Sequence, residues 1–207
     1  MMKIKRALIS VYDKKGIVDF AGELNKLRIE VIATGGTLKV LKEGGVQSMK
    51  HVSDVTDFPE ILGGRVKTVH PKLIGGILAL RSNEEHMDEL ERLGIQTVDM
   101  VVCNLYPFDK TIKGGVDLRV ALDNIDIGGP NMIRAAAKNF ENVVVIINPD
   151  KYNQVLKELK KKGDVSIRTR YNLAVEAFKE TARYDSTICK FLEKTFRGGT
   201  HVFGKAA

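Results

Sequence analysis

The sequence has few cysteines, few aromatic residues and no long apolar run. Its two cysteines, Cys103 and Cys189, provide no disulfide framework, so a reducing, cytoplasmic setting is expected. No stretch comes near the roughly 18 apolar residues that a membrane span needs, and no secretory apolar region follows Met1. Aromatic residues make up 6% of the chain and are not interleaved with basic ones. Binding to membranes or to nucleic acid is therefore not expected.

Several common catalytic and cofactor-binding motifs are also missing. Val66 stands before Lys67 where a GxxxxGK[ST] phosphate loop requires glycine, and no GxGxxG follows a predicted strand. The four histidines have no metal-ligand spacing with the two cysteines, and no GxSxG nucleophile motif is present. These absences exclude most common cofactor enzymes, so neither a cofactor nor a metal is expected.

What the sequence does contain is an excess of positive charge in an ordinary globular composition. Its net charge of +7 admits nucleic acid, an acidic membrane surface or a small phosphorylated ligand as a partner. With 43% hydrophobic residues, the 207 residues suffice for one large α/β domain or two small ones. Because no repeat or linker divides the chain, we expect one domain over residues 1–196. Residues 197–207 lack periodicity and are expected to form a flexible tail.

Short apolar segments alternate along the chain with segments of helical periodicity. Four of the apolar segments predict strands: 6–11, 30–36, 98–108 and 142–148. Residues 73–80 form a further apolar run. The periodic segments predict helices: 17–27, 38–41, 87–93, 118–125, 130–140, 149–163 and 166–196. This alternation predicts a mostly parallel sheet with helices on both faces, and such sheets bind ligands beyond the carboxyl ends of their strands.

Particular residues are expected to begin or orient these helices. The predicted N-caps are short polar side chains: Asp13, Thr37, Asp117 and either Ser82 or Asn83. The last helix places one set of mostly apolar residues on a single face: Tyr171, Ala174, Val175, Phe178 and Ala182.

Two polar segments follow the first two predicted strands. SVYDKKG and ATGGT offer hydroxyls, backbone N–H groups and an ammonium group, which together suit a phosphate. The residues concerned are Ser10, Lys14, Thr34, Gly35, Gly36 and Thr37. Taken alone, these residues are explained as well by turns and helix caps.

The stretch GGRVKTVHPKLIGGIL, residues 63–78, combines paired glycines with unbalanced positive charge. Arg65, Lys67, His70 and Lys72 lie within eight residues, and no acidic residue occurs from Gly63 to Arg81. A solvated loop would more often balance such charge with acids. The stretch therefore favours an anionic ligand or partner.

A third group of polar residues is expected at the same sheet edge. Asn104 and Tyr106 follow a predicted strand, while Asp126 precedes a predicted helix that carries Lys138. Each has an ordinary structural explanation: a packed tyrosine, a helix cap or a surface lysine. Their convergence beside a cationic loop indicates a reaction site.

Together, GGRVKTVHPKLIGGIL, CNLYPF and NIDIGGPNMIRAAAKN resemble the inosine monophosphate (IMP) cyclohydrolase half of the bifunctional purine-synthesis proteins. The other half of those proteins is an aminoimidazole carboxamide ribonucleotide (AICAR) transformylase. The likeness runs from about Lys5 to Phe196. It implies a methylglyoxal-synthase-like α/β fold and a hydrolase that runs in the ring-closing direction. Its purine nucleotide substrate would be 5-formamidoimidazole-4-carboxamide ribotide, converted to IMP and water without metal or organic cofactor.

The resemblance also implies roles for individual residues. Four match the positions assigned to catalysis: Lys67, Tyr106, Asp126 and Lys138. Others match positions that contact substrate: Ser10, Asp13, Lys14, Thr34, Gly35, Gly36, Thr37, Arg65, Thr68, Cys103, Asn104, Ile127 and Gly128. His70 is interpreted as structural. Three residues depart from the family pattern, because Tyr12 and Asn131 stand where hydroxyl residues are usual and Ile74 where histidine is usual.

Two points stay open at the level of sequence. Members of the family dimerise chiefly through the transformylase half, and this chain stops where that half would begin. It is then either a free-standing cyclohydrolase or a piece of a bifunctional protein. A free-standing cyclohydrolase would form its own homodimer and work with a separate transformylase. A regulatory module that binds a phosphorylated effector without turnover is the nearest alternative, and a nucleic-acid binder is the third.

Overall fold

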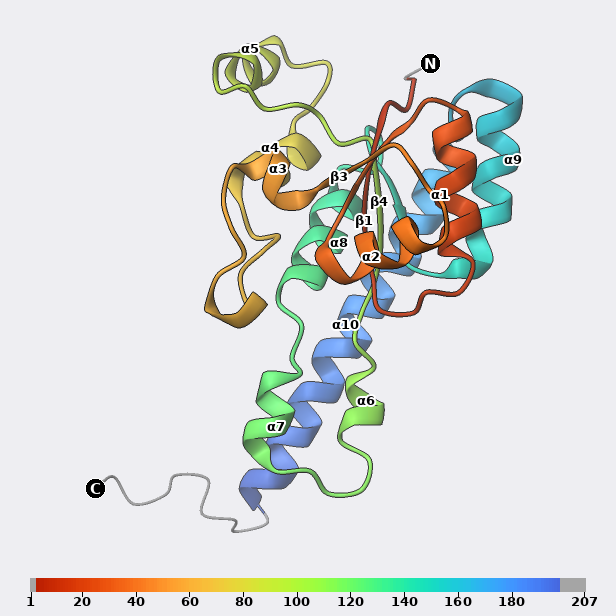
Figure 1. Ribbon diagram of the computed structural model, residues 1–207. Coiled ribbons are helices and arrows are strands. Elements are labelled where there is room, and N and C mark those ends of the chain that lie inside the picture. The colour runs from red at the N-terminus through yellow and green to blue at the C-terminus, as the bar shows by residue number, and fades with distance from the viewer. Residues whose placement is uncertain (1–2, 198–207) are drawn as a thin grey trace.

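The computed structural model describes residues 3–197 and has a five-stranded, wholly parallel sheet at its centre (Figure 1). The strand order is β3-β2-β1-β4-β5. The strands are β1 (Arg6–Val11), β2 (Glu30–Ala33), β3 (Met49–His51), β4 (Met100–Asn104) and β5 (Val144–Ile146). Because helices cover both faces, β1, β4 and β5 are apolar runs rather than alternating patterns.

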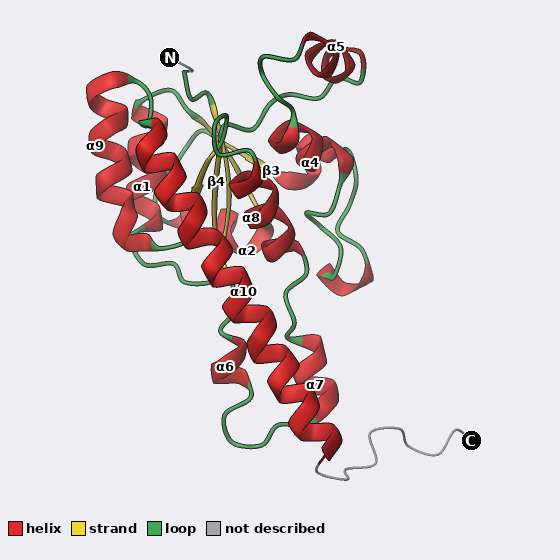
Figure 2. Cartoon of the chain, turned by 180° about the vertical axis from the view of Figure 1, so that it is seen from behind, coloured by secondary structure: helices red, strands yellow, loops and turns green. Residues whose placement is uncertain are grey.

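Helices surround this sheet and continue beyond it (Figures 1 and 2). They are α1 (Ile17–Lys26), α2 (Gly35–Glu43), α3 (Val52–Thr56), α4 (Pro71–Leu78), α5 (Glu84–Arg92), α6 (Phe108–Thr111), α7 (Leu118–Asp123), α8 (Gly128–Lys138), α9 (Tyr152–Lys162) and α10 (Ile167–Arg197). Two 3₁₀ turns, at Leu62–Gly64 and Pro149–Lys151, join them. Helices α1 and α9 lie on one side of the sheet and α4 and α8 on the other, with α10 packed against α8 and β5.

The C-terminal half of α10 extends past the sheet and carries a second apolar cluster (Figure 1). Phe108 of α6 and Ala121 of α7 pack there with Tyr184 of α10. The Phe108 ring makes edge contacts with Tyr184 and with Phe191, at centroid distances of 6.3 and 5.7 Å. This cluster holds residues 105–127, the segment that connects β4 to α8, in a defined position below the sheet.

Most predicted elements are confirmed. The apolar segments at 6–11, 30–36, 98–108 and 142–148 contain strands, although three of these strands are shorter than the apolar segments. Asn83 and Asp117 are N-caps, accepting backbone N–H groups from His86 and Arg119. The long final helix is present and ends at Arg197; the remainder of the expected tail, residues 198–207, lies outside the described residues.

Two helix starts differ from the prediction. Helix α2 begins at Gly35, so its N-cap position is Thr34 rather than Thr37. The hydroxyl of Thr37 bonds instead to the backbone of Val11 in β1, at 3.2 and 3.3 Å. Asp13 does not cap α1, which begins after Gly16 in a left-handed conformation; its carboxylate accepts the Lys15 N–H at 2.9 Å.

Two apolar segments have arrangements that the sequence did not predict. The run at 73–80 is mainly helix α4, in which Gly76 allows close packing: a Cβ there would lie 2.5 Å from the Gln96 carbonyl oxygen. Of the residues expected on one face of α10, Ala174 is buried, whereas Tyr171, Val175 and Phe178 are exposed. The buried face consists of Leu173, Ala174, Ala177, Thr181 and Tyr184. The helix is buried along the line where it meets α8 and β5.

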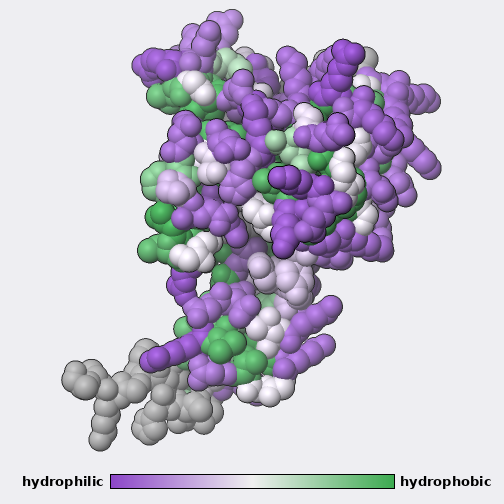
Figure 3. Space-filling model, viewed as in Figure 1, coloured by the Kyte–Doolittle hydropathy of each residue, from purple (hydrophilic) through white to green (hydrophobic). Residues whose placement is uncertain are grey.

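The surface seen in Figure 3 is mostly hydrophilic. Hydrophobic side chains gather on it near the 3₁₀ turn Leu62–Gly64 and over α7, and the exposed apolar residues of these segments are Ile61, Leu62, Val120 and Leu122. No helix within residues 3–197 combines the length and apolar character needed to cross a membrane.

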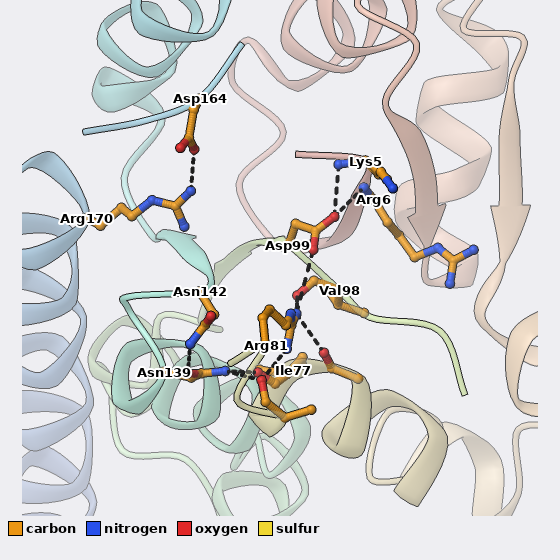
Figure 4. Close-up of polar contacts among 12 residues, drawn as sticks. Lys5, Arg6, Ile77, Arg81, Val98, Asp99, Asn139, Asn142, Asp164 and Arg170 are labelled. Carbon is orange, nitrogen blue, oxygen red and sulfur yellow. Dashed lines mark hydrogen bonds and ion pairs between the residues drawn. The ribbon is translucent and has the colours of Figure 1, made fainter. Parts of the chain in front are cut away.

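A buried polar network ties α4 to the amino-terminal edge of the sheet (Figure 4). Asp99, just before β4, accepts the backbone N–H groups of Lys5 and Arg6 at 2.9 and 3.1 Å, and lies 3.6 Å from the Arg81 guanidinium. Arg81 in turn donates to the carbonyl oxygens of Gly76 and Val98. The network therefore joins the starts of β1 and β4 to the end of α4.

Asn139, just after α8, completes this anchoring of α4 (Figure 4). Its amide donates to the carbonyl oxygens of Ile77 and Ala79 at 2.7 and 3.0 Å, and its own oxygen accepts from Asn142 at 2.8 Å. The last carbonyls of a helix have no partner within the helix, so these side chains satisfy them. Helix α4 is the second half of the glycine-rich cationic stretch, residues 63–78, and these bonds hold its end close to α8.

Candidate active site

The carboxyl ends of the central strands meet at one edge of the sheet, and most of the predicted site residues lie there. Ser10 is the last residue but one of β1, Thr34 directly follows β2, and Asn104 is the last residue of β4. The first turns of α2 and α8 begin at the same edge. The site is therefore assembled from segments up to 120 residues apart in the chain.

The N-terminus of α2 forms one end of the site. No side chain caps this nine-residue helix, so its first N–H groups can bind an anion. The hydroxyls of Ser10 and Thr34 are 3.1 Å apart, and the Lys14 ammonium donates to Thr37 Oγ1 at 3.1 Å and to the Val11 carbonyl oxygen. These donors suit a phosphate group.

Lys14 has an altered acidity in this setting. Burial, together with the neighbouring positive charge of Lys67, lowers the pKa of Lys14. Two ammonium groups that disfavour each other are both stabilised by an anion between or beside them. The electrostatics therefore favour a negatively charged ligand at this end of the site.

Asp126 marks the other end of the site. Burial raises the pKa of Asp126, while the Gly129 N–H, which donates to its carboxylate at 2.8 Å, and the charge of Lys67 oppose that rise. The backbone N–H of Asp126 donates to the Tyr184 hydroxyl at 2.8 Å. A partly buried carboxylate beside an ammonium group is a suitable proton acceptor.

Two glycines at the start of α8 permit this arrangement. A Cβ on Gly129 would lie 2.3 Å from an Asp126 carboxylate oxygen, and a Cβ on Gly128 would lie 2.3 Å from Thr68 Oγ1. Thr68 is buried, so the cationic stretch packs directly on the first turn of α8. This contact brings Lys67 and Asp126 to the same place.

Cys103 lies behind Asp126 at the end of β4. Its sulfur is 4.0 Å from the Gly129 carbonyl oxygen and its side chain is buried. Burial, and secondarily the charge of Asp126, raises the pKa of the Cys103 thiol. Cys103 is thus a neutral packing group and a weak donor rather than a nucleophile.

The turn before Lys67 has an unusual backbone. Ile61 and Val66 exchange two backbone hydrogen bonds, and Leu62, Gly63 and Gly64 inside that loop all have positive φ angles of 55°, 64° and 87°. Leu62 is a poor residue for this conformation, since its Cβ crowds the backbone there. Arg65 leaves the loop toward α7, where it pairs with Asp123 at the surface.

Asn104 fixes the loop that follows β1. Its side-chain oxygen accepts the N–H groups of Tyr12 and Asp13 at 2.6 and 2.9 Å, and its amide donates to the Asp13 carbonyl oxygen at 3.1 Å. Asn104 thus shapes the site through backbone contacts. The rings of Tyr12 and Tyr106 lie 4.6 Å apart and are each about half exposed, so Tyr106 stands at the rim with its hydroxyl available.

Within one chain, Lys138 does not lie near Asp126 and Lys67. It lies at the opposite end of α8 from Gly128, a helix length of about 15 Å. There it lines a separate groove of about 560 Å³ between α4, α8 and α10, together with Ile74 and Asn131, two of the departures from the family pattern. Ile127, at the start of α8, is exposed.

A cavity larger than this groove lies next to Asn104, which is one of its lining residues. It measures about 1040 Å³ and has a mixed lining that includes Tyr12, Asp13, Lys14, Asn104 and Arg183. Lys14 thus lines this cavity and also contacts α2 through Thr37. Within residues 3–197, no three His, Cys, Asp or Glu side chains come together as metal ligands would.

One contributor to the site had no signal in the sequence. Tyr184 lies 58 residues from Asp126 and was part of a helix with no assigned role, yet its hydroxyl accepts the Asp126 N–H. The contact depends on how α10 crosses the segment before α8. Only the packing of the two elements reveals it.

Comparison with known proteins identifies this architecture. A family model described as an MGS-like domain matches residues 16–131, which is more than half of the chain. The chain belongs to the MGS-like domain family. The expected fold is confirmed, and a second model, described as the AICARFT/IMPCHase bienzyme, matches residues 136–205 of this MGS-like protein.

Named relatives of this MGS-like protein carry the description "Bifunctional purine biosynthesis protein PurH". The protein from Acetivibrio thermocellus is 57% identical over 192 residues, that from Ruminiclostridium cellulolyticum 55% over 193, and that from Bacillus subtilis 52% over 192. These alignments cover 92–93% of this chain but 37% of each relative. A crystal structure of ForH is similar at a TM-score of 0.83 and 35% identity, covering 91% of this chain and 97% of that one.

Proposed function

We propose that this chain is an IMP cyclohydrolase. It closes the second purine ring of 5-formamidoimidazole-4-carboxamide ribotide, giving IMP and water as the last step of purine synthesis. The observation that carries the proposal is the placement of Asp126 and Lys67 beside each other at one end of a site whose other end is the uncapped α2 N-terminus with Lys14. A nucleotide bound there would be held by its phosphate at one end and by its reacting ring at the other.

The phosphate end supplies binding energy without chemistry. The first N–H groups of α2, the hydroxyls of Ser10, Thr34 and Thr37 and the ammonium of Lys14 are donors to phosphate oxygens. Holding the ribotide here fixes the carboxamide nitrogen next to the formyl carbon on the same imidazole ring. The reaction is intramolecular, so positioning provides much of the acceleration.

The reacting end supplies proton transfer and charge stabilisation. The carboxamide nitrogen attacks the formyl carbon and loses a proton, which Asp126 accepts or steers. Negative charge that develops on the formyl oxygen is met by the Lys67 ammonium and by the hydroxyl of Tyr106 at the rim. Removal of one such donor typically raises the barrier by about 3–4 kcal/mol.

Other residues assigned by resemblance shape the site. Asn104 and Asp13 order the loop after β1, while Cys103 and Gly128 pack beneath Asp126 and Thr68. We propose that Arg65, now paired with Asp123, turns to the nucleotide, and that exposed Ile127 borders the base. Lys138 can relay a proton only if the chain rearranges or a neighbouring chain supplies it, so a homodimer is part of the proposal.

The proposal extends to the setting of the enzyme. We propose that these 207 residues are sufficient for the cyclohydrolase activity. The formyl group of the substrate is supplied by an AICAR transformylase in the cytoplasm.

One assay tests the function directly. Purified protein is incubated with the formamido ribotide, and IMP formation is followed by its ultraviolet absorbance. Rapid ring closure that falls at least a hundredfold in Lys67→Ala and Asp126→Asn is expected. Binding of the ribotide without any turnover would instead make the chain a regulatory module.

A further inference from the structure

Two side chains beside the α2 N-terminus, His51 and Glu60, have no role in the proposed reaction. His51 ends β3 and stands in register with Ala33 of β2, so it reaches the same sheet edge as Thr34. Its Nε2 atom lies 3.5 Å from the position of a Cβ on Gly35, and a Glu60 carboxylate oxygen lies 3.6 Å from the same position. Both groups therefore border the start of α2.

The hydrogen bonds of His51 determine which ring nitrogen faces this position. Its Nδ1 accepts the backbone N–H of Ser53 at 3.2 Å and lies 2.6 Å from the Ser53 hydroxyl, because His51 is the N-cap of α3. A nitrogen that accepts an N–H carries no proton, so the ring proton is on Nε2. His51 thus presents an N–H donor toward Glu60 and the start of α2.

Glu60 lies between this donor and the cationic loop. One carboxylate oxygen is 3.8 Å from His51 Nε2, and the other is 3.6 Å from the position of a Cβ on Gly64. The positive end of a helix attracts a carboxylate, which explains where Glu60 lies. A phosphate at the α2 N-terminus would meet the negative charge of Glu60 at close range and be repelled.

We propose that His51 is a further phosphate-binding residue and that Glu60 is the internal anion with which the phosphate competes. In the structure His51 Nε2 lies 3.8 Å from a Glu60 carboxylate oxygen; when a phosphate binds at the start of α2, the Nε2 N–H donates to a phosphate oxygen and Glu60 moves away. Because Glu60 also borders Gly64, its departure frees the turn Leu62–Gly64 that precedes Lys67. This inference rests on the proposed function for the identity of the phosphate as that of a nucleotide.

Two substitutions separate the roles of the pair. His51→Asn retains a side-chain oxygen that can accept the Ser53 N–H and cap α3, but it places no donor at the Nε2 position. Glu60→Gln keeps the size of the side chain and removes its charge. His86→Asn is the matched control, since the Nδ1 of His86 also accepts a backbone N–H, from Leu80, in a different part of the fold.

The experiment measures binding of inorganic phosphate, IMP and inosine by calorimetry, with thermal unfolding as the check on folding. We expect His51→Asn to weaken binding of phosphate and IMP by about tenfold, and Glu60→Gln to tighten it severalfold. Inosine, which lacks the phosphate, should bind all variants alike, and His86→Asn should match the wild type. In the double variant the gain from Glu60→Gln should shrink, because the freed donor is no longer there.

Several outcomes would overturn the inference. They are wild-type phosphate affinity in a folded His51→Asn variant, weaker binding in Glu60→Gln, strictly additive effects in the double variant, or no phosphate binding by the wild type. The proposed function fails separately, through absence of ring closure. A chain without turnover that still shows the phosphate pattern would keep this inference and lose only the assigned reaction.

Discussion

At the scale of single residues, Asp126 has a proposed role in the reaction and lowers the stability of the folded protein at neutral pH. Its pKa in the folded protein is raised by burial, so the unfolded chain ionises at lower pH than the folded one. Stability is then lost as pH rises through the interval between the two pKa values, and the loss is complete above the folded value. A carboxylate of this kind, which we propose to be catalytic, does not contribute to folding stability at neutral pH.

Asp126→Asn should therefore abolish ring closure while leaving the protein at least as stable as the wild type at pH 7. The amide oxygen can still accept the Gly129 N–H, and no buried charge remains. Thermal unfolding at pH 7 and near pH 3 measures this: the variant's advantage should be present at pH 7 and disappear at the acidic pH. A variant that unfolds more easily at pH 7 would contradict this account of Asp126.

Gly129 is the residue that lets the Asp126 carboxylate turn back over α8. Gly129→Ala would place a methyl group 2.3 Å from that carboxylate and 2.7 Å from a Leu105 carbon. We expect a loss of about 1–3 kcal/mol in the free energy of unfolding, as in other overpacked sites, and a large fall in ring-closure rate.

Gly22→Ala is the control for this substitution. Gly22 lies in α1 with no atom within 4 Å of the added methyl group, so alanine should raise stability by about 0.5–1 kcal/mol. Urea unfolding curves distinguish the two variants. Equal effects of both would show that crowding at Asp126 is not the cause.

At the scale of elements, the position of the cationic stretch depends on how α4 ends. Asn139, at the C-terminal end of α8, donates hydrogen bonds to two carbonyl oxygens at the end of α4. Asn139→Ala leaves both without these partners in a buried setting, and we expect about 2–4 kcal/mol of destabilisation. Asn172→Ala, on the exposed face of α10, should change the unfolding midpoint little.

The length of each element and the layers that cover it explain which predictions from sequence succeeded. Apolar runs such as Met100–Asn104 can be recognised in the sequence as buried strands, because both faces of the sheet are covered. Met49–His51 was not predicted as a strand, since an edge strand of three residues with lysine at its centre shows no apolar run. The start of α2 was placed too late because paired glycines read as a turn, whereas here they form the first helical turn.

At the scale of the whole molecule, α10 links the lower cluster to the site. Its Tyr184 packs on Phe108 and accepts the Asp126 N–H, so the lower half of the protein helps to orient the segment that carries Asp126. Tyr184→Phe keeps the packing and removes the acceptor. We expect a loss of about 1–2 kcal/mol in stability and a lower ring-closure rate with KM little changed.

Tyr152 provides the comparison for this prediction. Its ring stacks on Phe20 at 4.3 Å, and burial, with Asp13 and Cys103 as the lesser causes, raises the pKa of Tyr152. Because no contact joins it to Asp126 in the described residues, Tyr152→Phe should lower kcat less than Tyr184→Phe does. If Tyr184→Phe lowers kcat no more than Tyr152→Phe, the lower cluster supports only folding.

The sequence by itself determined the parallel α/β fold and the edge of the sheet where polar residues gather, because strand periodicity and helix periodicity are local properties. It also placed Lys67 and Asp126 in one site through resemblance, although the contact depends on Thr68 packing on Gly128. Only the tertiary structure decided that Lys138 lies a helix length away and that Tyr184, His51 and Glu60 border the site. Such neighbours depend on how α8, α10 and β3 pack, and packing across dozens of residues leaves no periodic trace in the chain.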